Sequence, residues 1–101
     1  MKKVKVLHFF GRMDIGGAET FVINLFRNIN REKIHFEFAV LNSEKGYYDD
    51  EINQLGGKIH ILPSPKKNFN KYKEQVMKII VKNEIDVVHS HVHFFQVLTS
   101  V

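Results

Sequence analysis

The chain has 101 residues, of which 44% are hydrophobic and 26% are charged, and these values are typical of one soluble globular domain. Cysteine is absent, which excludes a disulfide scaffold and a thiolate zinc site. No apolar run is long enough to cross a membrane, and the formal net charge of +4 fits an anionic ligand or membrane surface without requiring nucleic acid.

The first segments predict a strand, a turn and a helix. Residues 4–10 are apolar, β-branched and aromatic, which predicts a strand covered on both faces. The turn-rich segment 11–17 follows. Apolar residues then recur on one face of a predicted helix, at Ala18, Phe21, Val22, Leu25, Phe26 and Ile29.

Three more strands and further helices are expected along the chain. The apolar segments 36–41, 58–62 and 85–89 predict strands. A short helix over 47–55 would be closed by the Gly56-Gly57 pair, because glycine accepts the left-handed cap conformation. Apolar spacing predicts a second amphipathic helix from Phe69 to Ile80 with outward lysines, and Phe94 to Val101 begins another.

Strands and helices alternate with short connections. This pattern predicts an α/β fold with an open parallel sheet, Rossmann-like, of about four strands in the order 3-2-1-4 with helices on both faces. The fourth strand is strongly apolar, but one unfinished helix is all that follows it. We therefore expect either the amino-terminal part of a longer protein or self-association that covers this sheet edge.

Gly16 and Gly17 lie directly before the first predicted helix. Ligands of open parallel sheets bind beyond the carboxyl ends of the strands, and unpaired N–H groups at a helix start favour an anion. The pair is a candidate phosphate-binding site, although Glu19 would repel an anion unless its side chain points away. The alternative, that both glycines only form a tight strand-to-helix turn, stays open.

Two known phosphate motifs are incomplete in this segment. Gly11 and Gly16 have the spacing that begins a P-loop, but Gly17 and Ala18 replace the lysine and hydroxyl residue that would bind phosphate and magnesium. A Gly-x-Gly-x-x-Gly dinucleotide fingerprint is also absent from the sequence.

Three alternating histidines, His89, His91 and His93, end the fourth predicted strand, and an extended backbone would point them the same way. We expect no metal there, because no nearby carboxylate has convincing ligand spacing. We assign His91 to a cleft, where it would hydrogen-bond a hydroxyl or phosphate, and expect His89 to be half-buried. The alternative is that all three are ordinary polar residues. No role is assigned to the remaining histidines, His8, His35 and His60.

Between residues 66 and 82 there are six lysines and one acidic residue, Glu74. We favour the solvated face of a helix, and contact with anionic lipid is the alternative. Nucleic-acid binding is disfavoured, because the lysines lack interleaved aromatic residues or a recognised reading motif.

Three segments occur in the order and at about the spacing of one enzyme family. They are the apolar segment 6–10, the segment 13–20 with its Gly-Gly-Ala-Glu sequence, and the segment 86–91, Asp-Val-Val-His-Ser-His. With them the chain resembles, over essentially its whole length, the amino-terminal part of a family 4 glycosyltransferase of GT-B fold. The resemblance is closest to bacterial enzymes that build exopolysaccharide or capsule.

The resemblance implies two Rossmann-like domains that face each other across a cleft. The first domain would bind the acceptor, and the second would bind the nucleotide-sugar donor. Such enzymes transfer the sugar with retention, usually without a metal, and no cofactor is expected. Gly16 and Gly17 would reach the donor diphosphate, and His91 would lie near the acceptor or the transferred sugar.

Residues 1–101 would form only part of the acceptor-side domain, without the donor domain, so we expect this polypeptide alone to be inactive. The enzyme is expected in the cytoplasm, with peripheral contact to the inner face of the membrane. The alternative is a stand-alone, flavodoxin-like module that binds a phosphorylated ligand at Gly16 and Gly17.

Overall fold

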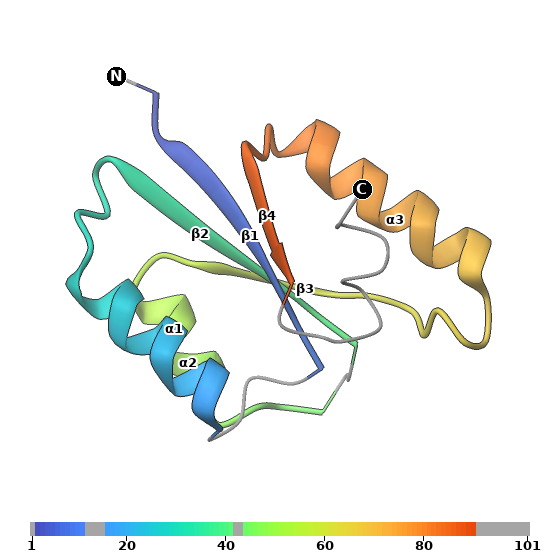
Figure 1. The fold of residues 1–101 in the computed structure, drawn as a ribbon, viewed down its shortest axis with the longest axis horizontal. Helices are drawn as coiled ribbons and strands as arrows, with labels where there is room; N and C mark the ends of the chain where they lie inside the picture. The colour runs from blue at the N-terminus through green and yellow to red at the C-terminus, as the bar shows by residue number, and fades with distance from the viewer. Residues whose placement is uncertain (1, 12–15, 42–43, 91–101) are drawn as a thin grey trace.

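The computed structural model describes residues 2–11, 16–41 and 44–90 (Figure 1). Strands and helices alternate, as the sequence pattern predicts. The elements are β1 (Val4–Phe10), α1 (Gly17–Asn28), β2 (Ile34–Val40), α2 (Asp49–Gln54), β3 (Lys58–Ile61), α3 (Phe69–Lys82) and β4 (Val87–Ser90). None of the helices in these described ranges is long and apolar enough to cross a membrane.

The four described strands form one parallel sheet in the order β3-β2-β1-β4, which confirms the predicted Rossmann-like α/β topology. The central strand, β1, pairs with β2 along its whole length. Its other side pairs with β4, with Phe9 opposite Ser90. Because these strands run in the same direction, their carboxyl ends share one edge of the sheet.

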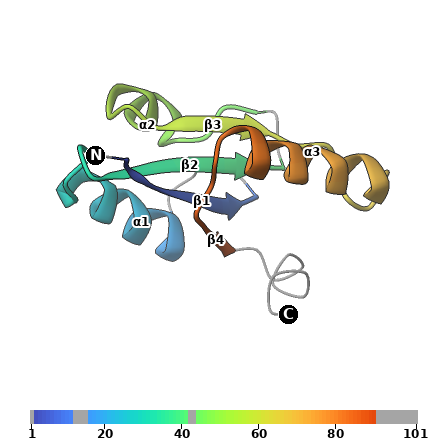
Figure 2. The same ribbon diagram turned by 90° about the horizontal axis from the view of Figure 1, so that it is seen from above.

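Two hydrophobic cores cover the two faces of the sheet, because successive side chains of a strand point to opposite faces. The core under α1 and α2 contains Phe10, Val22, Ile23, Phe26, Phe36, Phe38, Val40, Tyr48 and Ile52. The core under α3 contains Leu7, Phe9, Ala39, Leu62, Tyr72, Val76 and Ile79. Figure 1 shows α1 and α2 together to one side of the strands and α3 to the other, and Figure 2 gives the same arrangement from above.

The buried face of α1 differs from the predicted one. Val22, Ile23 and Phe26 are buried, whereas 67% of Phe21 and 42% of Leu25 are exposed. Consecutive helical residues are about 100° apart, so a helix that buries Val22 and Ile23 directs Phe21 outward. The apolar spacing identified the helix correctly but included residues that this part of the fold does not cover.

Helix α2 is shorter than the predicted segment 47–55. The backbone N–H of Gly46 donates to the Asp49 carboxylate at 2.8 Å, so the residues before Asp49 form a turn and not a first helical turn. Gly56 has φ +89°, which confirms the predicted left-handed cap. The Arg27 guanidinium binds the Glu51 carboxylate and so ties α2 to α1.

Candidate functional site at the carboxyl edge of the sheet

The candidate site lies where β1 and β4 end side by side. The chain builds β2 and β3 on one side of β1 and then crosses to place β4 on the other, so the strand order reverses between β1 and β4. In open α/β sheets this reversal leaves a crevice beyond the strand ends that binds ligands. Ser90 ends β4 there and is buried, and α1 begins at the same edge.

Gly16 and Gly17 form the start of α1, as predicted. Gly16 is the N-cap residue in an extended conformation, and its carbonyl accepts the Thr20 N–H at 2.9 Å. Gly17 is exposed, and a Cβ built on it would meet no atom within 4 Å. The N–H groups of a first helical turn have no partner within the helix, so Gly17 presents backbone at an open surface. These are the properties that a phosphate-binding turn requires.

The Glu19 side chain turns back over Gly16. A Cβ on Gly16 would lie 2.9 Å from Glu19 Oε1 and 3.2 Å from its Cδ. The carboxylate therefore does not point away from the helix start, and its negative charge opposes an anion that approaches Gly16. In this position it also offers acceptor oxygens for hydroxyl groups. Gly17 is the more open of the two glycines to a phosphate.

Two adjacent tyrosines beside the start of α1 were not identified from the sequence. The hydroxyl groups of Tyr48 and Thr20 are 2.8 Å apart, and Tyr48 is buried. The Tyr47 ring packs edge-to-face on Tyr48 with centroids 5.0 Å apart, and 67% of Tyr47 is exposed. Figure 1 shows the segment before α2 passing the start of α1. An exposed aromatic ring held in this way offers an apolar face to a ligand such as a sugar.

Of the three alternating histidines, only His89 lies in the described residues. It is exposed, so the expectation of a half-buried position was wrong. β4 is an edge strand of the described sheet, with a neighbouring strand on one side only. The His89 ring lies 5.6 Å from that of His8, which is buried in β1. His91 and His93 lie outside the described residues, and the role of His91 stays a prediction.

A buried polar network around Glu37 lies away from this edge, towards the beginning of the strands. Glu37 is 3% exposed, and its carboxylate contacts His60 Nε2 at 2.6 Å and His35 Nε2 at 3.1 Å. The Asn83 amide donates to it at 3.2 Å. Nearby, Lys5 Nζ donates to the Asn83 carbonyl at 2.9 Å. These contacts connect β2, β3 and the end of α3, which is a structural role.

The sequence did not reveal this network, because its members are far apart in the chain and no spacing relates them. Alternation places Glu37 on the same face of β2 as Ala39, but it does not identify a partner on another strand. Although histidine and carboxylate side chains meet here, no set of three His, Cys, Asp or Glu residues within 2–11, 16–41 and 44–90 is arranged to hold a metal ion.

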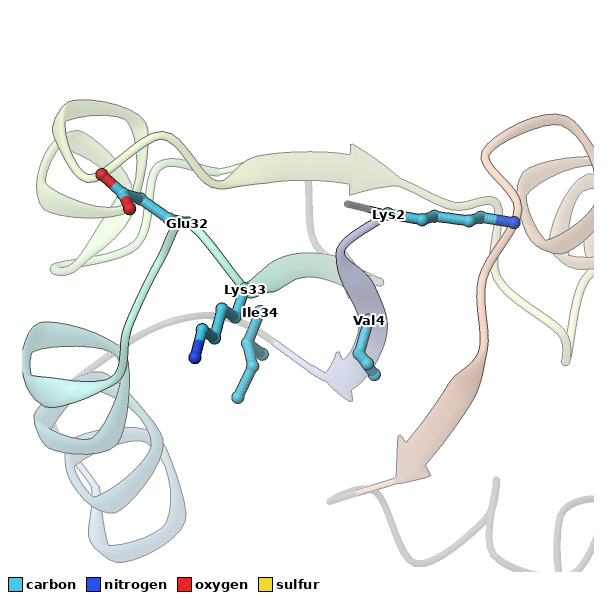
Figure 3. Close-up of a pocket in the computed structure, with 5 residues that line it drawn as sticks. All are labelled: Lys2, Val4, Glu32, Lys33 and Ile34. Atoms are coloured by element: carbon cyan, nitrogen blue, oxygen red, sulfur yellow. The ribbon is translucent and has the colours of Figure 1, made fainter.

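A shallow pocket at the opposite end of the sheet is a weak candidate (Figure 3). Its lining residues are Lys2, Val4, Glu32, Lys33 and Ile34, from the beginnings of β1 and β2. Figure 3 shows Lys2 and Glu32 extending away from each other, so their charged groups do not converge on one ligand. The pocket also lies far from the edge at which parallel sheets bind ligands.

Comparison with known proteins points to one class of enzyme. The chain is 37% identical over 91 residues to the capsular polysaccharide biosynthesis glycosyltransferase CapH of Staphylococcus aureus, a match that covers 90% of this chain. It is 36% identical over 92 residues, 89% of its length, to EpsF of Bacillus subtilis strain 168, which carries a provisional glycosyltransferase name. The chain is similar to bacterial glycosyltransferases. It spans about a quarter of the length of each of these relatives, 24%.

These relatives confirm the resemblance to bacterial glycosyltransferases of capsule and exopolysaccharide type that the Gly-Gly-Ala-Glu and Asp-Val-Val-His-Ser-His segments indicated. They do not favour the alternative of a stand-alone, flavodoxin-like module. No family model matched the chain. No solved structure matched it either.

Proposed function

We propose that these residues are the acceptor-side part of a retaining, family 4 glycosyltransferase of GT-B fold. The enzyme transfers a sugar from a nucleotide-sugar donor to a glycan or lipid-linked acceptor in polysaccharide synthesis. The observation that carries this proposal is the similarity to CapH and EpsF over nine-tenths of the chain. The open glycine turn at the carboxyl edge of the sheet supports it, because this is where the fold binds ligands.

In this proposal Gly16 and Gly17 bring backbone N–H groups to the donor diphosphate. Negative charge grows on the diphosphate as the bond to the sugar breaks, and fixed N–H dipoles stabilise that charge. Gly17 suits this task because no side chain lies between its backbone and solvent. His91 contacts the acceptor or the transferred sugar, and no cofactor or metal takes part.

The donor is bound by a second domain, which belongs to a longer chain than residues 1–101. Residues 1–101 alone therefore form a partial amino-terminal domain and do not transfer sugar. We place the enzyme in the cytoplasm, peripheral to the inner face of the membrane. The edge of β4, where 47% of Val87 is exposed, is the surface through which a separate polypeptide would self-associate.

The test compares the natural full-length chain with residues 1–101 in the presence of several nucleotide sugars and a membrane extract that supplies acceptors. We expect release of nucleotide and labelling of a glycan or lipid by the full-length chain only. Turnover by residues 1–101 alone would contradict the partial-domain assignment. A full-length chain that turns over none of the donors would contradict the proposed function.

A further inference from the structure

Tyr47 is an exposed aromatic residue held in a closed turn. The backbone N–H of Asp49 donates to the Gly46 carbonyl at 3.3 Å, and the Gly46 N–H donates to the Asp49 carboxylate at 2.8 Å. These two bonds close a four-residue turn in which Tyr47 and Tyr48 are the central pair. The two side chains differ in burial, because 67% of Tyr47 is exposed but only 7% of Tyr48.

Tyr48 fixes the position of the Tyr47 ring. The two rings pack edge-to-face with centroids 5.0 Å apart and planes at 88°. Tyr48 belongs to the core under α1 and α2, and its hydroxyl lies 2.8 Å from the Thr20 hydroxyl. The exposed ring is therefore supported by a buried residue that is itself tied to α1. A ring held in this way loses little conformational freedom when a ligand packs on it.

The turn lies at the edge of the sheet where ligands bind. It comes after β2, whose carboxyl end is beside that of β1, and Figure 1 shows this segment passing the start of α1. Thr20, which contacts Tyr48, is nearly one helical turn from Gly17. Tyr47 therefore borders the open glycine turn, next to which the sugar is transferred in the proposed function.

The charges around Tyr47 disfavour an anionic ligand. Segment 44–51 contains four acidic residues and one lysine: Glu44, Asp49, Asp50, Glu51 and Lys45. Lys45 Nζ lies 2.8 Å from the Asp50 carboxylate, and the Arg27 guanidinium binds Glu51, so these cations are already in ion pairs. Like charges repel, and a phosphate or a uronic acid is poorly placed against this ring. A neutral ligand fits it better.

We propose that Tyr47 is the stacking surface for a neutral sugar residue of the acceptor, and that it helps to determine which acceptor is used. One face of a pyranose ring carries mainly C–H groups, which leave water when they pack on an aromatic face. The sugar hydroxyls project from the rim and stay hydrogen-bonded to water or to polar groups. That this sugar belongs to the acceptor rests on the proposed function, whereas binding of a neutral sugar at Tyr47 is measured without any transfer reaction.

The experiment measures binding of the methyl glycosides of glucose, galactose and N-acetylglucosamine to the natural full-length chain by saturation-transfer difference NMR. The methyl glycoside of glucuronic acid is the anionic comparison, and UDP and GDP are the nucleotide comparisons. We expect at least one neutral glycoside to bind and the glucuronide to bind less tightly. Tyr47→Ala lowers the affinity for the neutral glycoside about tenfold, whereas Tyr47→Phe keeps the ring and changes it less than about twofold.

The matched control is Phe21→Ala, which removes an aromatic ring of the same exposed fraction, 67%. Phe21 lies about 100° around α1 from Thr20, the residue that contacts Tyr48. We expect glycoside binding to change less than about twofold in this variant, because its ring lies outside the proposed stacking surface. Thermal unfolding followed by circular dichroism verifies that each variant is folded.

The outcomes separate this proposal from the proposed function. Absence of neutral glycoside binding by the wild type overturns the proposal, as does an equal loss in Tyr47→Ala and Phe21→Ala or no loss in either. Weaker nucleotide binding with unchanged glycoside binding in Tyr47→Ala overturns it in favour of a contact with the donor base. In the transfer assay, Tyr47→Ala should raise the half-saturating amount of acceptor extract about tenfold with little change in kcat or in the donor KM. Failure of the proposed function is a different result, in which the wild type turns over no donor although glycoside binding depends on Tyr47.

Discussion

Polar groups are buried and paired in one region of this sheet and exposed in another. Around Glu37, towards the beginning of the strands, a carboxylate is buried and each of its oxygens is contacted by a histidine, with an amide donating as well. At the carboxyl edge, Gly17 is exposed and Tyr47 projects to solvent. Buried polar groups that are satisfied hold elements together, whereas exposed residues are accessible to a ligand. Buried polar chemistry alone therefore does not locate a ligand site in this sheet.

The largest expected effect on stability is that of a change in the buried network around Glu37. Glu37→Ala removes the acceptor that His35, His60 and Asn83 share and leaves these partly buried groups without it. We expect the free energy of unfolding to fall by about 3 kcal/mol, measured by urea denaturation. The exposed carboxylate of Glu32 provides the control, since Glu32→Ala should cost less than about 0.5 kcal/mol. Equal losses of stability in the two variants would contradict a structural role for the buried network around Glu37.

At the carboxyl edge of the sheet, Gly17→Ala should affect activity without lowering stability. Nothing lies within 4 Å of the added methyl group, and alanine is the better helix former, so stability is unchanged or rises by up to about 1 kcal/mol. If the donor diphosphate approaches this backbone, kcat/KM for the nucleotide sugar falls about tenfold or more in the full-length enzyme. Ala18→Ser changes the next exposed residue and leaves kcat/KM nearly unchanged. Full activity of the Gly17 variant would refute the donor contact.

The core under α3 can be tested by its response to alkaline pH. Burial raises the pKa of the Tyr72 phenol, because the charged form is poorly solvated there. The unfolded chain releases this proton at about pH 10, so stability from Tyr72 is complete below that pH and is lost as pH rises above it. We expect Tyr72→Phe to reduce the alkaline loss of stability by about 1 kcal/mol at pH 11, measured by urea denaturation against pH. Parallel pH profiles of wild type and variant would contradict the assignment.

The smallest expected effect concerns Glu19, whose carboxylate turns back over Gly16. Glu19→Gln keeps the size of the side chain and removes the charge. If a diphosphate binds at this helix start, donor affinity rises by at most about fivefold at low salt, and the gain shrinks as salt increases. Isothermal titration of the full-length chain with the nucleotide sugar measures it. Weaker donor binding would instead assign Glu19 to hydroxyl groups of a bound sugar.

Local patterns predicted most elements because each depends on residues close together in the chain. The apolar segment 4–10 and the Gly56 cap are confirmed. Patterns failed where burial depends on a distant element. Phe21 and Leu25 have core spacing but project beyond the residues that this part of the fold covers, and His89 is exposed because β4 is an edge strand here.

The order of apolar and turn-forming residues by itself determined a parallel α/β sheet and placed Gly16 and Gly17 before the first helix, because periodicity and glycine conformation act over a few residues. Tertiary structure alone decided that Glu37 meets His60, that Glu19 folds back over Gly16, and that Met77 and Val81 stay uncovered beside the lysines of α3. These outcomes depend on which surfaces meet when the strands pair and the helices pack. Pairing joins residues that no sequence spacing relates.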